Sequence, residues 1–478
     1  MTRRRVLAAA ALAAACALNP ATGRRQLSLI SESEEIRMGR EYDPQVAASM
    51  GLYADSGLQR YVQDLGARLA ARSERPGLPW TFRVVDDPAV NAFALPGGYI
   101  YVTRGILAHL DSEAELAAVL GHEIGHVTAR HSASQLSRQQ LTQVGLTLGS
   151  IVSKDVERYS GIAGAALGVL FLKYSRDNER EADHLGLRYM RRADYDAREM
   201  PDVFTMLERV SAAQPARGGR TPEWLATHPN PENRRARIAQ EIAALPPDSL
   251  GHRVQRDAYL RRIDGLVFCD DPRAGYFRGT EFLHPILRFR LRFPDGWTTQ
   301  NQRQAVVAVT PDRDATIQVT LAQQPTAAAA ARALLGQEGV TGDAPIRTAV
   351  NGLPAVSATF VATTENGDLR GSATFVEHGG RVFQLLALAP AARWPTHAAA
   401  AERAMRSFAP LTEPAVLAVQ PWRIAFVTLD RRATLAELAG RRPAPVPLAT
   451  IALINRTQPD APLTPGTVVK WVTGNPRP

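Results

Sequence analysis

Cysteine and lysine are scarce in this sequence. The chain has two cysteines, Cys16 and Cys269, among 478 residues. So few cysteines exclude a disulfide framework, and the fold must depend on buried apolar side chains. Lysine occurs only three times, so the net charge of +9 comes from arginines spread along the whole chain. No compact basic stripe with interleaved aromatic residues is present, and we therefore expect no nucleic-acid partner.

Long hydrophobic runs are absent beyond the N-terminus. The best later stretch, residues 161–172, is shorter than the roughly 18 apolar residues that a membrane span requires. At the N-terminus, three arginines at residues 3–5 precede an apolar run that ends at residue 15. This pattern predicts an export signal peptide over residues 1–15. We expect an exported, periplasmic protein that is not an integral membrane protein.

Cys16 follows the apolar run directly. The sequence Ala13-Ala14-Ala15-Cys16 resembles a bacterial lipobox, in which the cysteine becomes the lipidated first residue. In that case a lipid anchor at Cys16 attaches the protein to the outer membrane as a lipoprotein. The alternative is cleavage at an Ala-x-Ala site nearby, with Cys16 incidental. Both interpretations leave a polar leader over residues 16–30.

The remaining chain predicts three folded parts. Residues 31–250 show helical periodicity interrupted by short strands. A connector of mixed polarity follows at residues 251–280. Residues 281–410 alternate between apolar and polar side chains, which predicts a separate α+β domain, and residues 411–478 form a last small unit. The expected fold class is multidomain: a mainly α-helical domain with a small sheet, an α+β domain and a small α/β unit.

Residues 122–126 form an H-E-x-x-H motif within an amphipathic helical pattern. Four residues turn a helix by about 400°, so His122 and His126 lie one above the other. They also lie away from the apolar stripe, which argues against core histidines. Two imidazoles one turn apart can share a zinc ion. Glu123 is carried to the side of that ion, where it can accept a proton from water.

A catalytic zinc site needs a third protein ligand and an open position. Glu179 and Asp183 lie four residues apart on another predicted helix, so they share one face. Glu179 can ligate a metal, and Asp183 can accept the spare N–H of a ligating histidine. Glu181 lies about 200° around the helix from Glu179 and is expected to face elsewhere. Further on, His228 precedes a third predicted helix, and Arg234 lies in its early turns.

These three elements together resemble a known family, the HtpX-like and Ste-type zinc endopeptidases. The similarity is greatest to their soluble periplasmic BepA-like branch, and it spans about residues 19–245. The resemblance implies a zincin fold of the gluzincin type with one Zn²⁺ ion per chain. It implies that His122, His126 and Glu179 are the zinc ligands. By the same resemblance Glu123 is the catalytic base and Asp183 supports a ligand.

The resemblance also implies how the substrate binds. His228 and Arg234 would face the substrate carbonyl. An extended substrate would pair by β-addition with the strand formed by Asn91, Ala92, Phe93 and Ala94. The implied activity is endopeptidase cleavage of unfolded or misassembled envelope and outer-membrane proteins. The alternatives are a chaperone or a peptidoglycan-associated scaffold with a gated metal site, and a peptidoglycan hydrolase.

The last unit resembles a LysM module more weakly. Its segments follow a strand–helix–helix–strand outline, but Arg432-Ala433-Thr434 replaces the usual Gly-Asp-Thr. The resemblance implies peptidoglycan or an outer-membrane assembly factor as a partner. The alternative is a small structural or partner-docking domain.

Two further expectations concern access to the zinc. A neutral His228 can donate a hydrogen bond to the oxyanion, or it can occupy the fourth position and hold the enzyme off. The segment 132–174 contains several glycines and is expected to form a lid over the same cleft.

Overall fold

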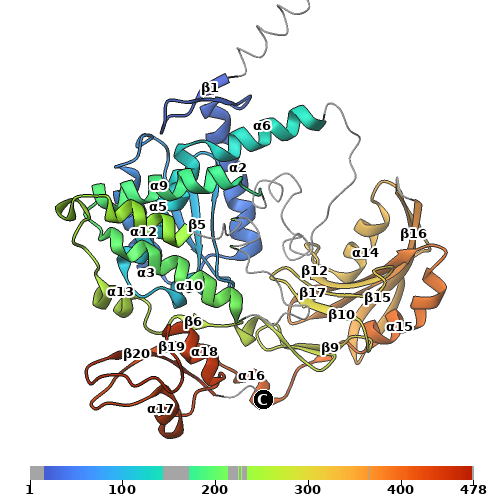
Figure 1. Ribbon diagram of the computed structural model, residues 1–478. Coiled ribbons are helices and arrows are strands. Elements are labelled where there is room, and N and C mark those ends of the chain that lie inside the picture. Colours follow the sequence, from blue (N-terminus) through green and yellow to red (C-terminus); the bar gives the residue numbers. More distant parts are fainter. Residues whose placement is uncertain are drawn as a thin grey trace, which may run out of the picture. The chain divides into compact units, whose positions relative to one another are not determined.

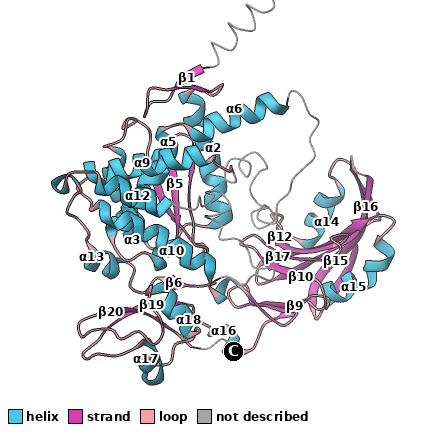
Figure 2. Cartoon of the chain, viewed as in Figure 1, coloured by secondary structure: helices cyan, strands magenta, loops and turns pink. Residues whose placement is uncertain are grey.

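The structure is a computed structural model that describes residues 16–143, 172–213, 224, 228, 234–364 and 367–475. The chain forms two compact units. The first contains Met1–Asp270 and Trp422–Gly474, and the second contains Asp271–Pro421 and Asn475–Pro478. Helices dominate the first unit and strands dominate the second (Figure 1, Figure 2). Within the described ranges, no helix has both the length and the apolar character of a membrane span.

This division differs from the predicted one. We expected residues 411–478 to form a unit of their own and residues 251–280 to be a connector. Instead, Trp422–Gly474 belongs to the unit that carries the H-E-x-x-H motif, and the first unit continues to Asp270. The physical reason is a shared hydrophobic core. Its buried side chains come from both parts of the chain and include Leu116, Ile124, Leu260, Phe268, Ile424, Ile451 and Trp471.

The helices of the first unit surround a three-stranded sheet. The sheet has the order β3-β5-β4, with β3 parallel to β5 and β4 antiparallel to it. The strands are β3 (Thr81–Val85), β4 (Ala92–Leu95) and β5 (Tyr99–Thr103), preceded by a leader hairpin of β1 (Cys16–Leu18) and β2 (Arg25–Leu27). The helices are α2 (Glu32–Met50), α3 (Ser56–Ala70), α4 (Arg104–His109), α5 (Glu113–Thr128), α6 (His131–Gln143), α9 (Arg176–Arg192), α10 (Met200–Ala212), α12 (Arg234–Ala243) and α13 (Arg256–Arg262).

Alternate residues of this sheet face two different layers. On one face, Phe82 and Ile100 join the apolar side chains of α3 and α5 in the main core. On the other face, Phe93 and Tyr101 pack with Val46 of α2. Every residue of β4 and β5 is therefore buried. Helix α5 packs against β4, so the motif helix lies beside the edge strand of the sheet.

The C-terminal part of the first unit has the predicted strand–helix–helix–strand order. Its elements are β19 (Trp422–Thr428), α17 (Leu435–Arg441), α18 (Leu448–Ile454) and β20 (Val468–Thr473). Strand β19 pairs with β20 on one side and with β6 (Val267–Phe268) on the other. Two cations from this part contact the start of the motif helix and the segment just before it. Lys470 donates to the carbonyl oxygens of Ala108 and Leu110, and Arg456 donates to the carboxylate of Glu115.

The second unit contains residues 281–410, for which we predicted an α+β domain, and it has both strands and helices. Its larger sheet has the order β10-β11-β12-β17-β16-β15-β13, with β14 also paired to β15, and its smaller sheet has the order β18-β9-β8-β7. The strands are β7 (Tyr276–Arg278), β8 (Glu281–His284), β9 (Phe289–Arg292), β10 (Thr298–Asn301), β11 (Ala305–Val309), β12 (Thr316–Leu321), β13 (Val340–Gly342), β14 (Ile346–Val350), β15 (Leu353–Thr364), β16 (Gly367–His378), β17 (Arg381–Pro390) and β18 (Ala409–Pro410). The helices are α14 (Ala327–Leu335), α15 (Trp394–Arg406) and α16 (Pro414–Leu417). Helices α14 and α15 pack into two separate apolar clusters of the larger sheet.

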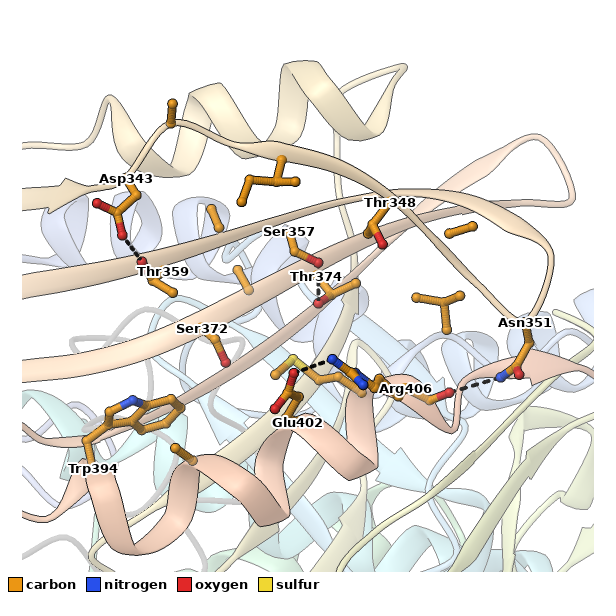
Figure 3. A pocket seen from close by; sticks show the side chains of 18 residues that line it. Asp343, Thr348, Asn351, Ser357, Thr359, Ser372, Thr374, Trp394, Glu402 and Arg406 are labelled. Atoms are coloured by element: carbon orange, nitrogen blue, oxygen red, sulfur yellow. Dashed lines mark hydrogen bonds and ion pairs between the residues drawn. The ribbon is translucent and has the colours of Figure 1, made fainter.

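A groove of about 830 Å³ lies between β14 and α15 of the second unit (Figure 3). Its lining includes hydroxyl side chains of two neighbouring strands: Ser357, Thr359, Ser372 and Thr374. Helix α15 contributes Trp394 and the ion pair between Glu402 and Arg406.

Candidate metal centre

Helix α5 places the H-E-x-x-H motif inside the protein. The helix begins after Ser112, whose hydroxyl accepts a hydrogen bond from the backbone N–H of Glu115. All 16 residues of the helix are buried, including His122, Glu123 and His126. Imidazole and carboxylate groups are rarely buried without partners, so this helix needs polar groups from its neighbours.

Helix α9 supplies those neighbours because it packs very closely against α5. A Cβ atom on Gly186 would lie 2.9 Å from the backbone nitrogen of His122, and one on Gly125 would lie 2.9 Å from the carbonyl oxygen of Ala182. Only glycine allows two helix backbones to approach this closely without a shift. The approach brings Glu179 and Asp183 of α9 beside the histidines of α5.

Four buried side chains converge on one point. One ligand atom from each of His122, His126, Glu179 and His228 lies within 4.8 Å of the other three. His122 Nε2 is 3.0 Å from His126 Nε2 and 3.3 Å from His228 Nδ1. Glu179 Oε1 is 3.0 Å from His228 Nδ1 and 3.4 Å from His126 Nε2.

These distances fit a tetrahedral zinc ion. Zn–N bonds of about 2.05 Å correspond to ligand–ligand distances of roughly 3.3 Å in a tetrahedron. Imidazole nitrogens with one carboxylate oxygen are a ligand set that zinc accepts readily. Beside the set, Glu123 Oε1 is buried and has no hydrogen-bond partner among the described residues. The residues present therefore fit a zinc ion and an adjacent catalytic carboxylate.

Asp183 holds the first histidine in a ligating orientation. His122 Nδ1 lies 3.0 Å from Asp183 Oδ1, so the ring donates there and turns Nε2 toward the other ligands. Arg234 donates to both oxygens of Asp183, and its Nη1 is 3.0 Å from Glu179 Oε2. The arginine thus neutralises two buried carboxylates at once.

The electrostatics of the centre follow from burial and from these pairs. Burial raises the pKa of Glu123, although the neighbouring His228 and His122 act in the opposite direction. Burial also disfavours ionisation of Glu179, but His228, His126 and Arg234 outweigh it and hold the pKa of Glu179 well below its usual range. Burial disfavours protonation of His228, but the carboxylates of Glu179 and Glu123 raise its pKa. A raised pKa at Glu123 suits a group that must take up a proton near neutral pH.

Aromatic rings cover the centre. Tyr174 stacks on His126 with ring centroids 3.9 Å apart, and Trp224 stacks on His228 with centroids 4.4 Å apart. His228 itself is 1% exposed and takes the fourth place in the ligand set. The centre is therefore closed in this structure.

Three of the four residues predicted to bind the substrate lie on an edge strand of the small sheet. Ala92, Phe93 and Ala94 belong to β4, which pairs with β5 and has no second strand partner among the described residues. Asn91 directly precedes it and is buried. These residues are covered in the closed structure, since Phe93 packs in an apolar cluster with Leu172.

Arg234 lies differently from expectation, whereas Glu181 lies as expected but has one further contact. Arg234 does not point into open space for a substrate carbonyl, because its donors are occupied by Asp183 and Glu179. Glu181 does lie away from the four-residue set, yet it connects to the centre indirectly through His131. The positions of His131, Tyr174 and Trp224 beside the centre were not predicted from the sequence. The only sequence signal for His131 was that it follows His126 by five residues; it begins the next helix, α6, and does not continue α5.

Part of the predicted machinery falls outside the described residues. The expected lid is described only at its ends, residues 132–143 and 172–174. The residues on both sides of His228 and those before Arg234 are likewise outside the described ranges.

The part of the chain that forms this centre is similar in sequence to known peptidases. A sequence model of peptidase family M48 matches residues 56–242. The β-barrel assembly-enhancing proteases of Yersinia pestis and Escherichia coli K12 are 36% and 35% identical over 227 and 238 residues, which cover 45% and 48% of this chain and 46% and 48% of those proteins. The mitochondrial metalloendopeptidase OMA1 of Schizosaccharomyces pombe is 31% identical over 244 residues, which cover 50% of this chain and 69% of that protein. The chain belongs to peptidase family M48.

The M48 match includes every member of the metal centre. It begins at α3 and ends within α12, so it contains the motif helix, α9 and His228. The chain spans just under half the length of the two bacterial relatives. The second unit and the C-terminal part of the first unit lie outside the M48 match.

Proposed function

We propose that this protein is an exported zinc endopeptidase. The single observation that carries the proposal is the buried set of three imidazoles and one carboxylate beside Glu123, at distances that suit one zinc ion. The M48 membership and the metalloendopeptidase relatives support the same conclusion. We assign His122, His126 and Glu179 as the three permanent ligands.

The chain's own residues perform the proton transfers. When bound, a zinc ion supplies Lewis-acid activation of water and of the scissile carbonyl. Glu123 accepts a proton from the attacking water and later gives it to the leaving amine, so the carboxylate is regenerated in each cycle. Arg234 positions Glu179 and Asp183 rather than contacting the substrate, because its donors are already engaged.

His228 has a gating role in this proposal. It lies among the three ligands, and its Nε2 is 3.7 Å from Glu123 Oε1. The imidazole therefore blocks the approach to the catalytic base and must move before a substrate carbonyl can enter. The alternative role for this imidazole is donation of a hydrogen bond to the oxyanion. The substrate backbone then pairs with the edge of β4 that has no strand partner among the described residues, and α5 packs against this strand.

The substrates that we propose are unfolded or misassembled envelope and outer-membrane proteins. The support is the name of the bacterial relatives, β-barrel assembly-enhancing proteases. An extended, unfolded segment is also what an edge strand can bind, because the substrate must offer its backbone hydrogen-bonding groups. The predicted export signal favours a periplasmic location, and a lipidated Cys16 would anchor the protein to the outer membrane.

The second candidate function is a scaffold or chaperone whose metal centre stays closed. The closed arrangement of His228 favours it. In this version the LysM-like C-terminal part binds peptidoglycan or an outer-membrane assembly factor. That part packs into the core of the protease unit, which instead favours a structural role for it.

The test compares the wild-type protein with Glu123→Gln. We expect one zinc per chain in both proteins, and casein digestion only in the wild type, because glutamine cannot accept the proton. Digestion of casein by Glu123→Gln at the wild-type rate would contradict the mechanism. Zinc retention without digestion in the wild type, together with sedimentation on peptidoglycan, would favour the scaffold. Release of muropeptides would indicate a peptidoglycan hydrolase.

A further inference from the structure

The second histidine of the motif also has a partner behind it. His126 turns Nε2 toward the other ligands, and its Nδ1 lies 2.9 Å from Nδ1 of His131. On the far side of that ring, His131 Nε2 lies 3.1 Å from Glu181 Oε2. Glu181 in turn accepts a hydrogen bond of 2.9 Å from the side-chain amide of Asn19. Asn19, His131 and His126 are at most 3% exposed.

In the hydrogen-bonded series His126–His131–Glu181, the carboxylate of Glu181 determines which nitrogen atoms donate. A carboxylate only accepts hydrogen bonds, so Nε2 of His131 must carry the proton that faces Glu181. In the neutral ring Nδ1 is then the acceptor, so Nδ1 of His126 must donate to it. Nε2 of His126 is left with a lone pair that faces the other ligands, which is the tautomer a metal requires.

Asn19 is itself fixed by a turn of the leader. Its side-chain oxygen accepts hydrogen bonds from the backbone N–H groups of Ala21 and Thr22, so the amide NH₂ is turned toward Glu181. Further contacts hold the leader against the end of the motif helix and against α6. Gln26 donates to the carbonyl oxygen of Ala129, and Ser137 Oγ accepts from the backbone N–H of Leu29.

We propose that Asn19, Glu181 and His131 are positioning residues that fix the tautomer and ring orientation of His126. The leader is then a component of the metal centre. His122 has its own support in Asp183, so each motif histidine is oriented by a different part of the chain. This inference rests on the proposed metal site.

The test measures zinc affinity of the purified full chain by competition with a chelator, together with the visible absorption of the Co²⁺-loaded protein. His131→Phe keeps a ring of similar size but removes the acceptor for His126. We expect zinc affinity to fall about 10- to 100-fold, the usual cost of losing a supporting partner, and the Co²⁺ bands to shift. His131→Asn returns an acceptor near the position of Nδ1 and should recover part of the loss.

Asn19→Ala removes the residue at the other end of this hydrogen-bonded series. Asn19 is more than 100 residues from either motif histidine in the sequence. It should weaken zinc binding less than His131→Phe, and combining it with His131→Phe should add no further loss. The matched control is His184→Phe, since His184 is an exposed residue of α9 whose ion pair with Glu241 does not touch the centre. Far-UV circular dichroism of each apoprotein tests whether the variant is folded.

The outcomes separate this inference from the proposed function. If the wild type binds no zinc, the proposed function itself fails. If the wild type binds zinc and folded His131→Phe binds it equally tightly with an unchanged Co²⁺ spectrum, the positioning role is overturned and the leader only packs there. Should His131→Phe not fold, Asn19→Ala with wild-type affinity and spectrum overturns the role of the leader.

Discussion

The contact between Arg456 and Glu115 gives a sharp prediction for stability. Arg456 donates from Nη1 and Nη2 to the two oxygens of Glu115 at 2.6 Å each, and also to the carbonyl oxygen of His109. Glu115 is 1% exposed and lies in the first turn of the motif helix. Arg456→Met removes the cation but keeps an apolar side chain of similar length, so it leaves a buried carboxylate without its charge partner.

The expected loss is large for a single substitution. Breaking a buried ion pair by removing one partner costs about 3–5 kcal/mol, because the remaining charge stays desolvated. For a unit of several hundred residues, about 2–4 °C of Tm corresponds to each kcal/mol. We therefore expect the first unit of Arg456→Met to unfold roughly 10 °C lower than in the wild type.

The rescue variant separates this electrostatic effect from lost packing. Glu115→Gln in the Arg456→Met background removes the unpaired charge, yet its amide oxygen can still accept from the backbone N–H of Asp111 as Glu115 does. The double variant should regain more than half of the loss in urea and thermal unfolding. Arg442→Met is the matched control, because Arg442 is exposed at the end of α17 and should change stability by less than about 0.5 kcal/mol. A double variant no more stable than Arg456→Met would refute the reasoning.

The remaining predictions concern pH, gating and anchoring. Burial lowers the pKa of His109 from 6.5 to about 4. Between these two pH values the unfolded chain binds a proton at His109 and the folded protein does not. The contribution of His109 to the free energy of unfolding is fully present above pH 6.5. It falls by roughly 3 kcal/mol toward pH 4, at 1.36 kcal/mol per pKa unit. His109→Gln should flatten this pH dependence in urea titrations. His228→Ala should raise the rate of peptide hydrolysis because it opens the fourth position, whereas a fall of about 10²-fold would indicate an oxyanion donor instead. The protein should fractionate with membranes and Cys16→Ser should release it; equal solubility of the two forms would contradict lipidation.

Local periodicity predicted much of the fold. The alternation of Phe289 and Leu291 with Arg290 and Arg292 indicated a half-buried strand, and β9 shows this pattern, with the two apolar residues buried and the arginines exposed. Helix geometry likewise placed His122 and His126 on one face. Such predictions succeed because one element's own pattern determines which of its faces is buried.

The supporting contacts of the centre could not be predicted in this way. The angle of Glu181 around α9 was correct, but its partner His131 lies 50 residues earlier, and Asn19 lies 162 residues earlier. The attachment of Trp422–Gly474 to the protease unit could not be predicted for the same reason. The pairing of β19 with β6 joins segments more than 150 residues apart. No periodicity within a single element encodes which distant segment will cover it.

The close packing of α5 on α9 shows how such long-range information is nevertheless present in the sequence. Gly121 and Gly125 lie one turn apart on α5, and Gly186 lies on α9 where a Cβ atom would meet the backbone of the motif. Glycine in a helix interior costs about 1 kcal/mol relative to alanine, so three of them at one interface indicate a requirement for close approach. That approach brings the carboxylate of Glu179 within 3.4 Å of Nε2 of His126. The position of Glu179 as a metal ligand therefore depends on these glycines as much as on its own carboxylate.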